Sequence, residues 1–99
     1  MIFSFELNVE ARNELTEAYL WYEEQQEGLG NSFRAEFQNK LNLICNNPLH
    51  YKISRRKFHE ALIDRFPFLI IYTIEEKSQK IIVFAVFHTS RDPKKKFRK

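Results

Sequence analysis

The sequence contains little glycine, proline and cysteine. Two Gly, three Pro and one Cys occur in 99 residues, which argues against long irregular segments and a disulfide framework. The neighbours of Cys45, Leu43 and Ile44, predict a buried thiol in a reducing compartment. No apolar run approaches the ~20 residues that a membrane helix needs, and residues 1–5 lack the basic start of a signal peptide. We therefore expect a cytoplasmic protein without a membrane contact.

Apolar residues are abundant, and charge is unevenly distributed. Hydrophobic residues make up 43% of the chain and aromatic residues 15%, which suits one packed domain over residues 1–99. Residues 1–49 carry three basic and eight acidic groups, whereas residues 50–99 carry thirteen basic and five acidic groups. A basic C-terminal half favours an anionic partner, either nucleic acid or an acidic protein. A solvated, solubilising surface is the alternative interpretation.

The first half of the chain predicts a strand and two helices. Residues 2–7 alternate in polarity, which indicates a strand. Its inward-facing residues are predicted to be Phe3, Phe5 and Leu7. Asn8 is a favourable N-cap for an amphipathic helix that runs to about Glu27, with Gly28 at its C′ position. A second amphipathic helix follows and ends before Pro48.

The second half predicts strands, of which the last two form a hairpin. Residues 58–63 have the character of an edge strand with a bulge. Residues 65–74 and 80–88 form the hairpin, with Tyr72 opposite Val83. The last strand is apolar at seven consecutive positions, 81–87, so both of its faces must be covered. The helices can cover one face, and the C-terminal tail, a partner chain or both must cover the other.

These elements predict an α+β fold in the order β-α-α-β-β-β. The sheet is expected to be small, twisted and mostly antiparallel, because its final strands are joined by short connections. Two adjacent helices with a short glycine-containing connection should form an antiparallel helical hairpin. We expect this hairpin to pack on one face of the sheet.

Candidate chemistry is concentrated at the open end of the strand hairpin. Arg65, His88 and Arg91 are expected there, where a histidine could exchange protons and the arginines could bind phosphate. Such a set could cleave RNA without metal through its 2′-hydroxyl, although a structural role for these residues is the alternative. The candidates for binding nucleic acid or another target are Arg55, Arg56, Lys57, Lys94, Lys95, Lys96 and Arg98.

No metal or cofactor is expected from the sequence. The three histidines do not follow a ligand spacing, and a single cysteine cannot build a zinc cluster. The only two glycines, Gly28 and Gly30, do not form a phosphate-binding loop. Any catalysis would therefore depend on acid–base and cationic side chains.

Five short segments, none of which is specific alone, together and in this order form a pattern that is fairly specific for one protein family. They are Ala11…Leu15…Ala18…Trp21-Tyr22-Glu23, Gly28-Leu29-Gly30-Asn31-Ser32-Phe33, Asn47-Pro48 with Tyr51, Arg65-Phe66-Pro67-Phe68 with Tyr72, and Val83-Phe84-Ala85-Val86-Phe87-His88 with Arg91-Asp92-Pro93. This pattern resembles the RelE/ParE superfamily of toxins from bacterial type II toxin–antitoxin modules, which includes plasmid stabilisation proteins. The resemblance spans the chain and implies the same order of elements.

The resemblance also implies a partner. Such toxins inhibit growth and are neutralised by a cognate antitoxin, so a hetero-oligomer with that antitoxin is expected. An antitoxin segment could supply the missing cover for the apolar strand and an acidic partner for the basic half. Candidate antitoxin contacts are Trp21, Phe84 and Val86.

The resemblance leaves three functions open. RelE-like members cut mRNA on the ribosome and commonly have an arginine three residues before the strand tyrosine, where this chain has Leu69. ParE-like members poison DNA gyrase and need no nuclease residues, and the pattern around His88, Arg91 and Asp92 is closer to theirs. We expect a ParE-like gyrase poison. The alternatives are a metal-free mRNA endoribonuclease and a non-catalytic protein-binding module.

Overall fold

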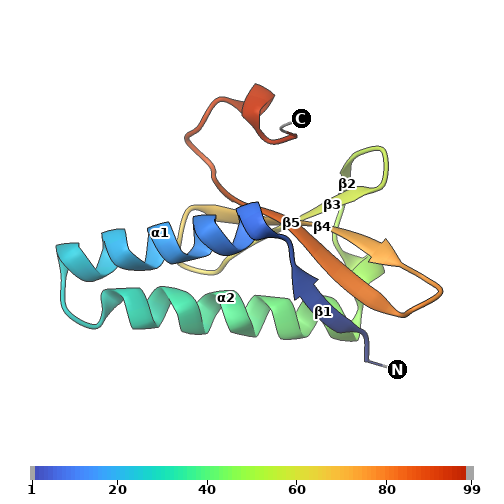
Figure 1. Cartoon of the computed structure of the whole chain (residues 1–99), viewed down its shortest axis with the longest axis horizontal. Coiled ribbons are helices and arrows are strands. Elements are labelled where there is room, and N and C mark those ends of the chain that lie inside the picture. The colour runs from blue at the N-terminus through green and yellow to red at the C-terminus, as the bar shows by residue number, and fades with distance from the viewer. Residues whose placement is uncertain (1, 98–99) are drawn as a thin grey trace.

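The computed structural model describes residues 2–97 as two helices and a five-stranded sheet (Figure 1). In chain order the elements are β1 (Ser4–Leu7), α1 (Val9–Gln25), α2 (Leu29–Asn46), the 3-10 turn η1 (Pro48–His50), β2 (Ile53–Arg55), β3 (Phe58–Leu62), β4 (Phe68–Glu75), β5 (Lys80–His88) and the 3-10 turn η2 (Pro93–Lys95). The strand order is β1-β5-β4-β3-β2, and only β1 and β5 run parallel. The predicted α+β fold and mostly antiparallel sheet are confirmed.

The two helices begin at different kinds of cap. The Asn8 side chain accepts a hydrogen bond from the Ala11 amide at 2.9 Å, which confirms the predicted N-cap of α1. At α2 the cap is Gly28, which takes a left-handed φ of +87°. Because α1 ends at Gln25 with Gln26 as its C-cap, Gly28 lies one residue beyond the predicted C′ position of α1. The Glu23 carboxylate of α1 accepts from the Gly28 and Gly30 amides, each at 2.9 Å. One helix therefore satisfies the free amides that begin the next.

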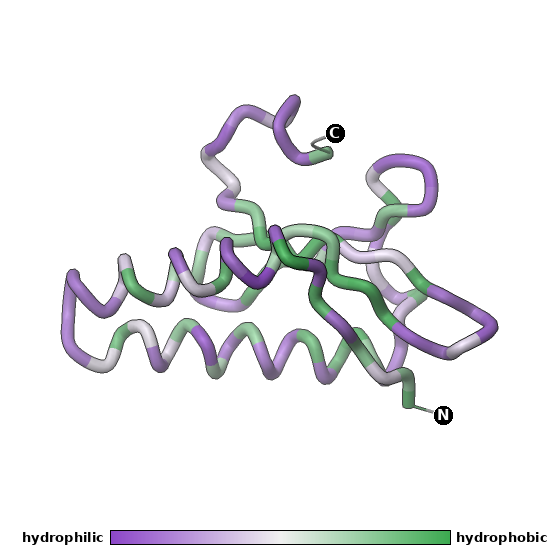
Figure 2. Tube along the Cα trace, viewed as in Figure 1, coloured by the Kyte–Doolittle hydropathy of each residue, from purple (hydrophilic) through white to green (hydrophobic). Residues whose placement is uncertain are grey.

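The main core lies between α2 and the central strands. Phe33, Phe37, Leu41 and Ile44 of α2 are buried, at the i, i+4, i+8, i+11 spacing of one helix face. They belong to the same cluster as buried residues of β4 and β5. Figure 2 agrees with this burial pattern: hydrophobic and hydrophilic positions alternate along α2, and the central strands contain long hydrophobic stretches.

The β4–β5 hairpin contains a bulge that changes its register. Tyr72 lies opposite Val83, as predicted, but the register shifts at the next pair, so that Phe84 is the extra residue. Continuing the predicted register without a bulge places Phe68 opposite Phe87, but beyond the bulge Phe68 lies opposite His88, so the prediction at this end is wrong by one residue. A strand that is apolar on both faces carries no alternation that would fix its register.

The edge of the sheet differs from the prediction by one strand. The expected single edge strand over residues 58–63 corresponds to β3, and the additional strand β2 forms the true edge. The two are joined at Arg56 and Lys57, where Arg56 takes a φ of +50°. All three residues of β2 are exposed, so no buried side left a periodic pattern in the sequence.

The C-terminal segment covers the second face of the sheet. Ile71, Ala85 and Phe87 are buried in a cluster separate from the main core. The Phe97 ring lies 5.0 Å from that of Phe58 at the edge of this cluster. Figure 1 shows the red C-terminal segment on the opposite side of the sheet from α2. The prediction that the tail covers the apolar strand is confirmed, whereas cover by a partner stays a prediction.

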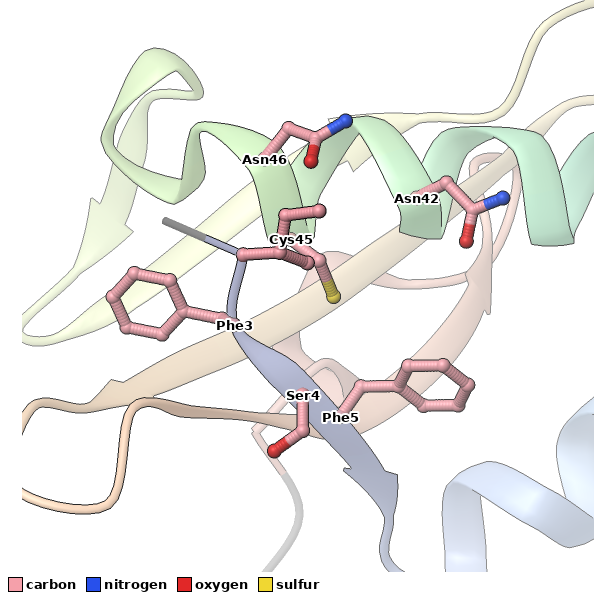
Figure 3. A pocket seen from close by; sticks show the side chains of 7 residues that line it. Phe3, Ser4, Phe5, Asn42, Cys45 and Asn46 are labelled. Carbon is pink, nitrogen blue, oxygen red and sulfur yellow. The ribbon is translucent and has the colours of Figure 1, made fainter.

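The first strand is less buried than its alternation suggested. Phe3 and Leu7 pack against the core, whereas Phe5 faces a hollow beside α2, is 42% exposed and does not join the core. The reason is a hollow of about 500 Å³ between β1 and the end of α2, which α2 borders with short polar side chains (Figure 3). Its lining residues are Ile2, Phe3, Ser4, Phe5, Asn42, Cys45 and Asn46. Burial raises the pKa of the Cys45 thiol, which keeps it protonated and unreactive.

We expect Tyr72→Phe to destabilise the fold without changing its shape. Tyr72 is fully buried, and its hydroxyl donates to the Pro48 carbonyl at 2.6 Å. The substitution leaves that carbonyl without this hydrogen bond, at an expected cost of about 1–3 kcal/mol in the free energy of unfolding. Urea denaturation followed by circular dichroism measures it. Tyr19→Phe on the half-buried side of α1 is the matched control, and an equal effect there would contradict the assignment.

Candidate functional site

Two adjoining hollows lie where β4 begins and β5 ends. Each has a volume of about 240 Å³. Both are lined by Ala18 and Trp21 of α1 and by Phe68 and His88, which face each other across the hairpin. Trp21 is 56% exposed, whereas the His88 ring packs edge-on against Phe68 at 4.9 Å. We call the two hollows together the hairpin-end groove.

The groove differs in character between its two ends. One end also includes Tyr22, where burial raises the pKa of the phenol. The other end includes Glu14, Glu17 and Arg91, so it is charged. An aromatic floor with a mixed-charge rim is typical of a surface that receives a side chain of a partner molecule.

The hydrogen bonds of His88 define its protonation pattern. Its Nδ1 accepts from the Ser90 amide at 3.0 Å and lies 2.8 Å from the Ser90 hydroxyl. An amide can only donate, so Nδ1 has no proton and the neutral ring carries its proton on Nε2. The lone pair that a general base would use is thus already engaged. In this arrangement His88 is a hydrogen-bond donor through Nε2.

Arg65 is directed away from the groove. Its backbone φ is +69°, and its guanidinium donates to the Glu36 carboxylate of α2 at 2.7 and 3.1 Å. Arg65 lines neither hollow. Of the three candidate catalytic residues, His88 and Arg91 share the groove and Arg65 lies outside it.

Glu14 completes the edge of β5 inside the groove. Its carboxylate accepts from the Val86 amide at 2.8 Å. β1 pairs with β5 only as far as Val83, so a helix side chain continues the hydrogen bonding where the neighbouring strand has ended. Arg91 lies near this point with its guanidinium 5.4 Å from the centre of the Phe87 ring.

The candidate antitoxin contacts lie in three different environments. Trp21 is exposed at the rim of the groove, and Val86, which is 2% exposed, lies beneath it. Phe84 is half-buried on the other face of the sheet, between Phe58 and Phe97. In this structure Trp21 alone of the three offers a large exposed surface, so an antitoxin contact at Phe84 would require movement of the tail.

The predicted basic residues come from two segments. Arg55, Arg56 and Lys57 lie at the β2–β3 turn, and Lys94 and Lys95 lie on η2. All five are exposed. Lys96 instead pairs with the buried Glu60 carboxylate at 3.0 Å, and Arg98 lies outside the described residues.

The structure offers no obvious place for a metal ion or a membrane helix within residues 2–97. That part of the chain holds no group of three or more histidine, cysteine, aspartate or glutamate side chains arranged to bind a metal. Neither α1 nor α2 is long and apolar enough to cross a bilayer.

Several groove residues were not identified from the sequence. The missed acids Glu14 and Glu17 share one face of α1 with Trp21, which had been identified, at spacings of three and four residues. That spacing could have linked the acids to the tryptophan. Ser90 follows His88 by two residues, which is close enough for the observed hydrogen bond. The contact of Arg65 with Glu36 had no comparable signal, because 29 residues separate them.

Several solved structures resemble this fold, and three of them come from toxin–antitoxin systems or their toxins. The chromosomal ParDE system of P. aeruginosa contains a chain with a TM-score of 0.76 and 10% identity, covering 90% of this chain and 98% of that one. The isolated E. coli RelE toxin has a TM-score of 0.69 and 14% identity, with 92% and 88% covered. A chain of the RelBE2 toxin–antitoxin complex of Mycobacterium tuberculosis has a TM-score of 0.64 and 16% identity, with 89% and 99% covered.

These structural similarities show the fold, whereas a match to a family model shows the family of the sequence. A comparison with curated proteins finds no match. Residues 5–93 match the model described as the ParE toxin of the type II toxin–antitoxin system parDE. That match includes both helices and all five strands of the sheet, apart from Ser4 at the start of β1. The chain therefore belongs to the family of ParE toxins of type II toxin–antitoxin systems.

Proposed function

We propose that this toxin inhibits growth by poisoning DNA gyrase and that a cognate antitoxin neutralises it. The observation that carries the proposal is the state of His88. Its Nδ1 lone pair is engaged by the Ser90 amide, and Arg65 is paired with Glu36 instead of facing it. The acid–base pair that RNA cleavage would require is thus not assembled in this arrangement.

The environment of Leu69 also supports a function without RNA cleavage. Leu69 occupies the position where the resemblance to RelE-like toxins implies an arginine, and it packs with Ile71, Ala85 and Phe87. A cation placed in that apolar cluster would lose its hydration without a partner. The face of the sheet that carries Leu69 therefore suits packing and not the stabilisation of a cleaved phosphate.

The proposed binding partner of this toxin is a protein antitoxin. Two of the similar structures are toxin–antitoxin systems from P. aeruginosa and M. tuberculosis. In this chain the hairpin-end groove, with the exposed Trp21 at its rim, is the surface we assign to the antitoxin. A large, partly exposed aromatic residue beside a hollow is a common anchor in protein interfaces.

Purified toxin tests the proposed target directly. Inhibition of gyrase-catalysed supercoiling, with accumulation of cleaved DNA, is the expected result, and added antitoxin should reverse it. His88→Ala should retain this inhibition within about threefold, whereas removal of a true general acid–base group costs about 10²–10⁴-fold. Arg12→Ala, at an exposed site on α1, is the matched control.

The other two functions give different results in the same experiment. Codon-dependent cleavage of ribosome-bound mRNA that His88→Ala abolishes would assign the ribonuclease function and overturn the proposal. Antitoxin binding without inhibition of gyrase, of translation or of growth would assign a non-catalytic binding module. Expression of the toxin without antitoxin, followed by assays of DNA damage and of mRNA integrity, separates these outcomes in cells.

A further inference from the structure

Folding brings two distant basic segments together above the sheet. Arg55, at the end of β2, places its guanidinium 5.0 Å from the centre of the Phe97 ring. That ring also lies 5.0 Å from Phe58, the first residue of β3. Figure 1 shows the β2–β3 turn and the C-terminal segment both on the side of the molecule away from α2, and Figure 2 shows both as largely hydrophilic. Phe97 thus joins the β2–β3 turn to the segment that carries Lys94 and Lys95.

The position of the tail is fixed by a second contact. Lys96 donates to both oxygens of the Glu60 carboxylate, at 3.0 and 3.2 Å. Only 3% of the Glu60 side chain is exposed, so removal of Lys96 would leave a buried carboxylate without its counter-ion. This pair and the packing of Phe97 hold η2 close to the β2–β3 turn.

Five cations of the joined segments form no ion pair with the part of the chain that the structure describes. Within residues 2–97 the ion pairs involve Lys40, Arg65, Lys80 and Lys96, and not Arg55, Arg56, Lys57, Lys94 or Lys95. Glu60 is already paired with Lys96, and Asp92 accepts a hydrogen bond from the Lys94 amide at 3.0 Å. Holding several like charges close together costs free energy that an anionic ligand would recover.

The surface suits phosphate groups better than an acidic protein. A tightly bound protein needs large apolar anchors, and none of the exposed large hydrophobic residues lies in 55–57 or 93–97. A phosphate backbone is bound by charge and by guanidinium and ammonium donors, without such anchors. We propose that Arg55, Arg56, Lys57, Lys94 and Lys95 form one binding site for the sugar–phosphate backbone of nucleic acid.

This site adds a second ligand to the proposed function. Gyrase acts on DNA, and a toxin that holds the DNA backbone as well as the enzyme would stay on the gyrase–DNA complex longer than on either component. That consequence rests on the proposed function. The binding of nucleic acid by the purified chain does not, so the two can be tested separately.

Fluorescence anisotropy with a short labelled DNA duplex measures the binding. The logarithm of the affinity should fall with the logarithm of the salt concentration, with a slope of about −4 to −5 if all five cations contact phosphates. Arg56→Ala/Lys57→Ala and Lys94→Ala/Lys95→Ala should each weaken binding at low salt by more than tenfold and make the slope shallower by about two. The same strand as single-stranded DNA and as RNA identifies which backbone is preferred.

A matched pair of variants separates local contacts from net charge. Arg12→Ala/Lys77→Ala also removes two exposed cations, but from α1 and the β4–β5 loop, and should leave affinity within about twofold. Phe97→Ala removes no charge, yet should weaken binding several-fold because it separates the two segments. A thermal melt of each variant checks that the fold is retained. The Lys94/Lys95 double variant keeps the test informative if Phe97→Ala does not fold.

Three results would overturn the inference. They are a slope near zero, equal affinities of the surface and control double variants, and binding of an acidic polyglutamate peptide as tight as that of the duplex. The last result would assign the surface to an acidic protein. Measuring gyrase inhibition in parallel shows whether the DNA-binding site or the proposed function is contradicted. A toxin that inhibits gyrase without binding DNA contradicts this site alone, and one that binds DNA without inhibiting gyrase contradicts the proposed function alone.

Discussion

Phe33→Ala is expected to lower the free energy of unfolding by about 3–5 kcal/mol, the largest effect of any single substitution considered. Phe33 is fully buried at the centre of an aromatic cluster. Its ring lies 5.3 Å from both Tyr22 and Phe66 and 5.1 Å from Phe68. Removing the ring leaves a cavity bordered by rigid aromatic groups, which can collapse only in part.

The measurement is chemical denaturation of the two proteins side by side. Leu43→Ala on the outer side of α2, where Leu43 is 50% exposed, is the control and should cost less than about 1 kcal/mol. Tyr22 and Phe68 also line the hairpin-end groove, so Phe33→Ala should weaken antitoxin binding more than Leu43→Ala does. Equal losses of stability at the two positions would contradict the aromatic cluster as the main support of the helix–sheet contact.

Gly30→Ala is expected to destabilise the toxin by about 1–3 kcal/mol, although alanine normally favours a helix. A Cβ at Gly30 would lie 2.6 Å from the Tyr19 carbonyl oxygen and 2.8 Å from the Glu23 carboxylate. The Tyr19 oxygen belongs to the backbone and cannot move alone, so α1 and α2 must separate. The same shift disturbs the Glu23 carboxylate that accepts from the first amides of α2.

The neighbouring position provides the control for this prediction. Asn31→Ala, on the exposed side of the same turn of α2, gains helix propensity without a clash and should be neutral or stabilising by a few tenths of a kcal/mol. Thermal unfolding of both variants gives the comparison. A Gly30→Ala protein at least as stable as the Asn31→Ala protein would show that the two helices are not held at this close approach.

Local signals predicted those parts of the fold that depend on neighbouring residues. Asn8 caps α1 because its side chain reaches an amide three residues ahead. The two-sided apolarity of β5 predicted a second cover, and the tail supplies one through Phe97. In both cases the physical cause lies within one element or in a simple need for burial.

Features that depend on contacts between distant parts of the chain could not be predicted from the sequence. The strand β2 is three residues long and all of its residues are exposed, so its pairing with β3 left no hydrophobic pattern. The bulge at Phe84 changed the register in a strand whose two faces are equally apolar. At the candidate site, His88 and Arg91 were correctly expected near each other, but the pairing of Arg65 with Glu36 depends on how α2 docks.

The parallel pairing of β1 with β5 has a consequence for synthesis of the toxin. Ser4 pairs with Lys80 and Leu7 with Val83, so the first strand must wait for the last one before the sheet can close. Contacts of such sequence separation form late and slowly. During translation the sheet can therefore be completed only after β5 (Lys80–His88) has been made. A nascent chain released before residue 80 lacks β5, which joins β1 to β4 in the sheet and supplies His88 to the hairpin-end groove, so we expect such incomplete products to be inactive.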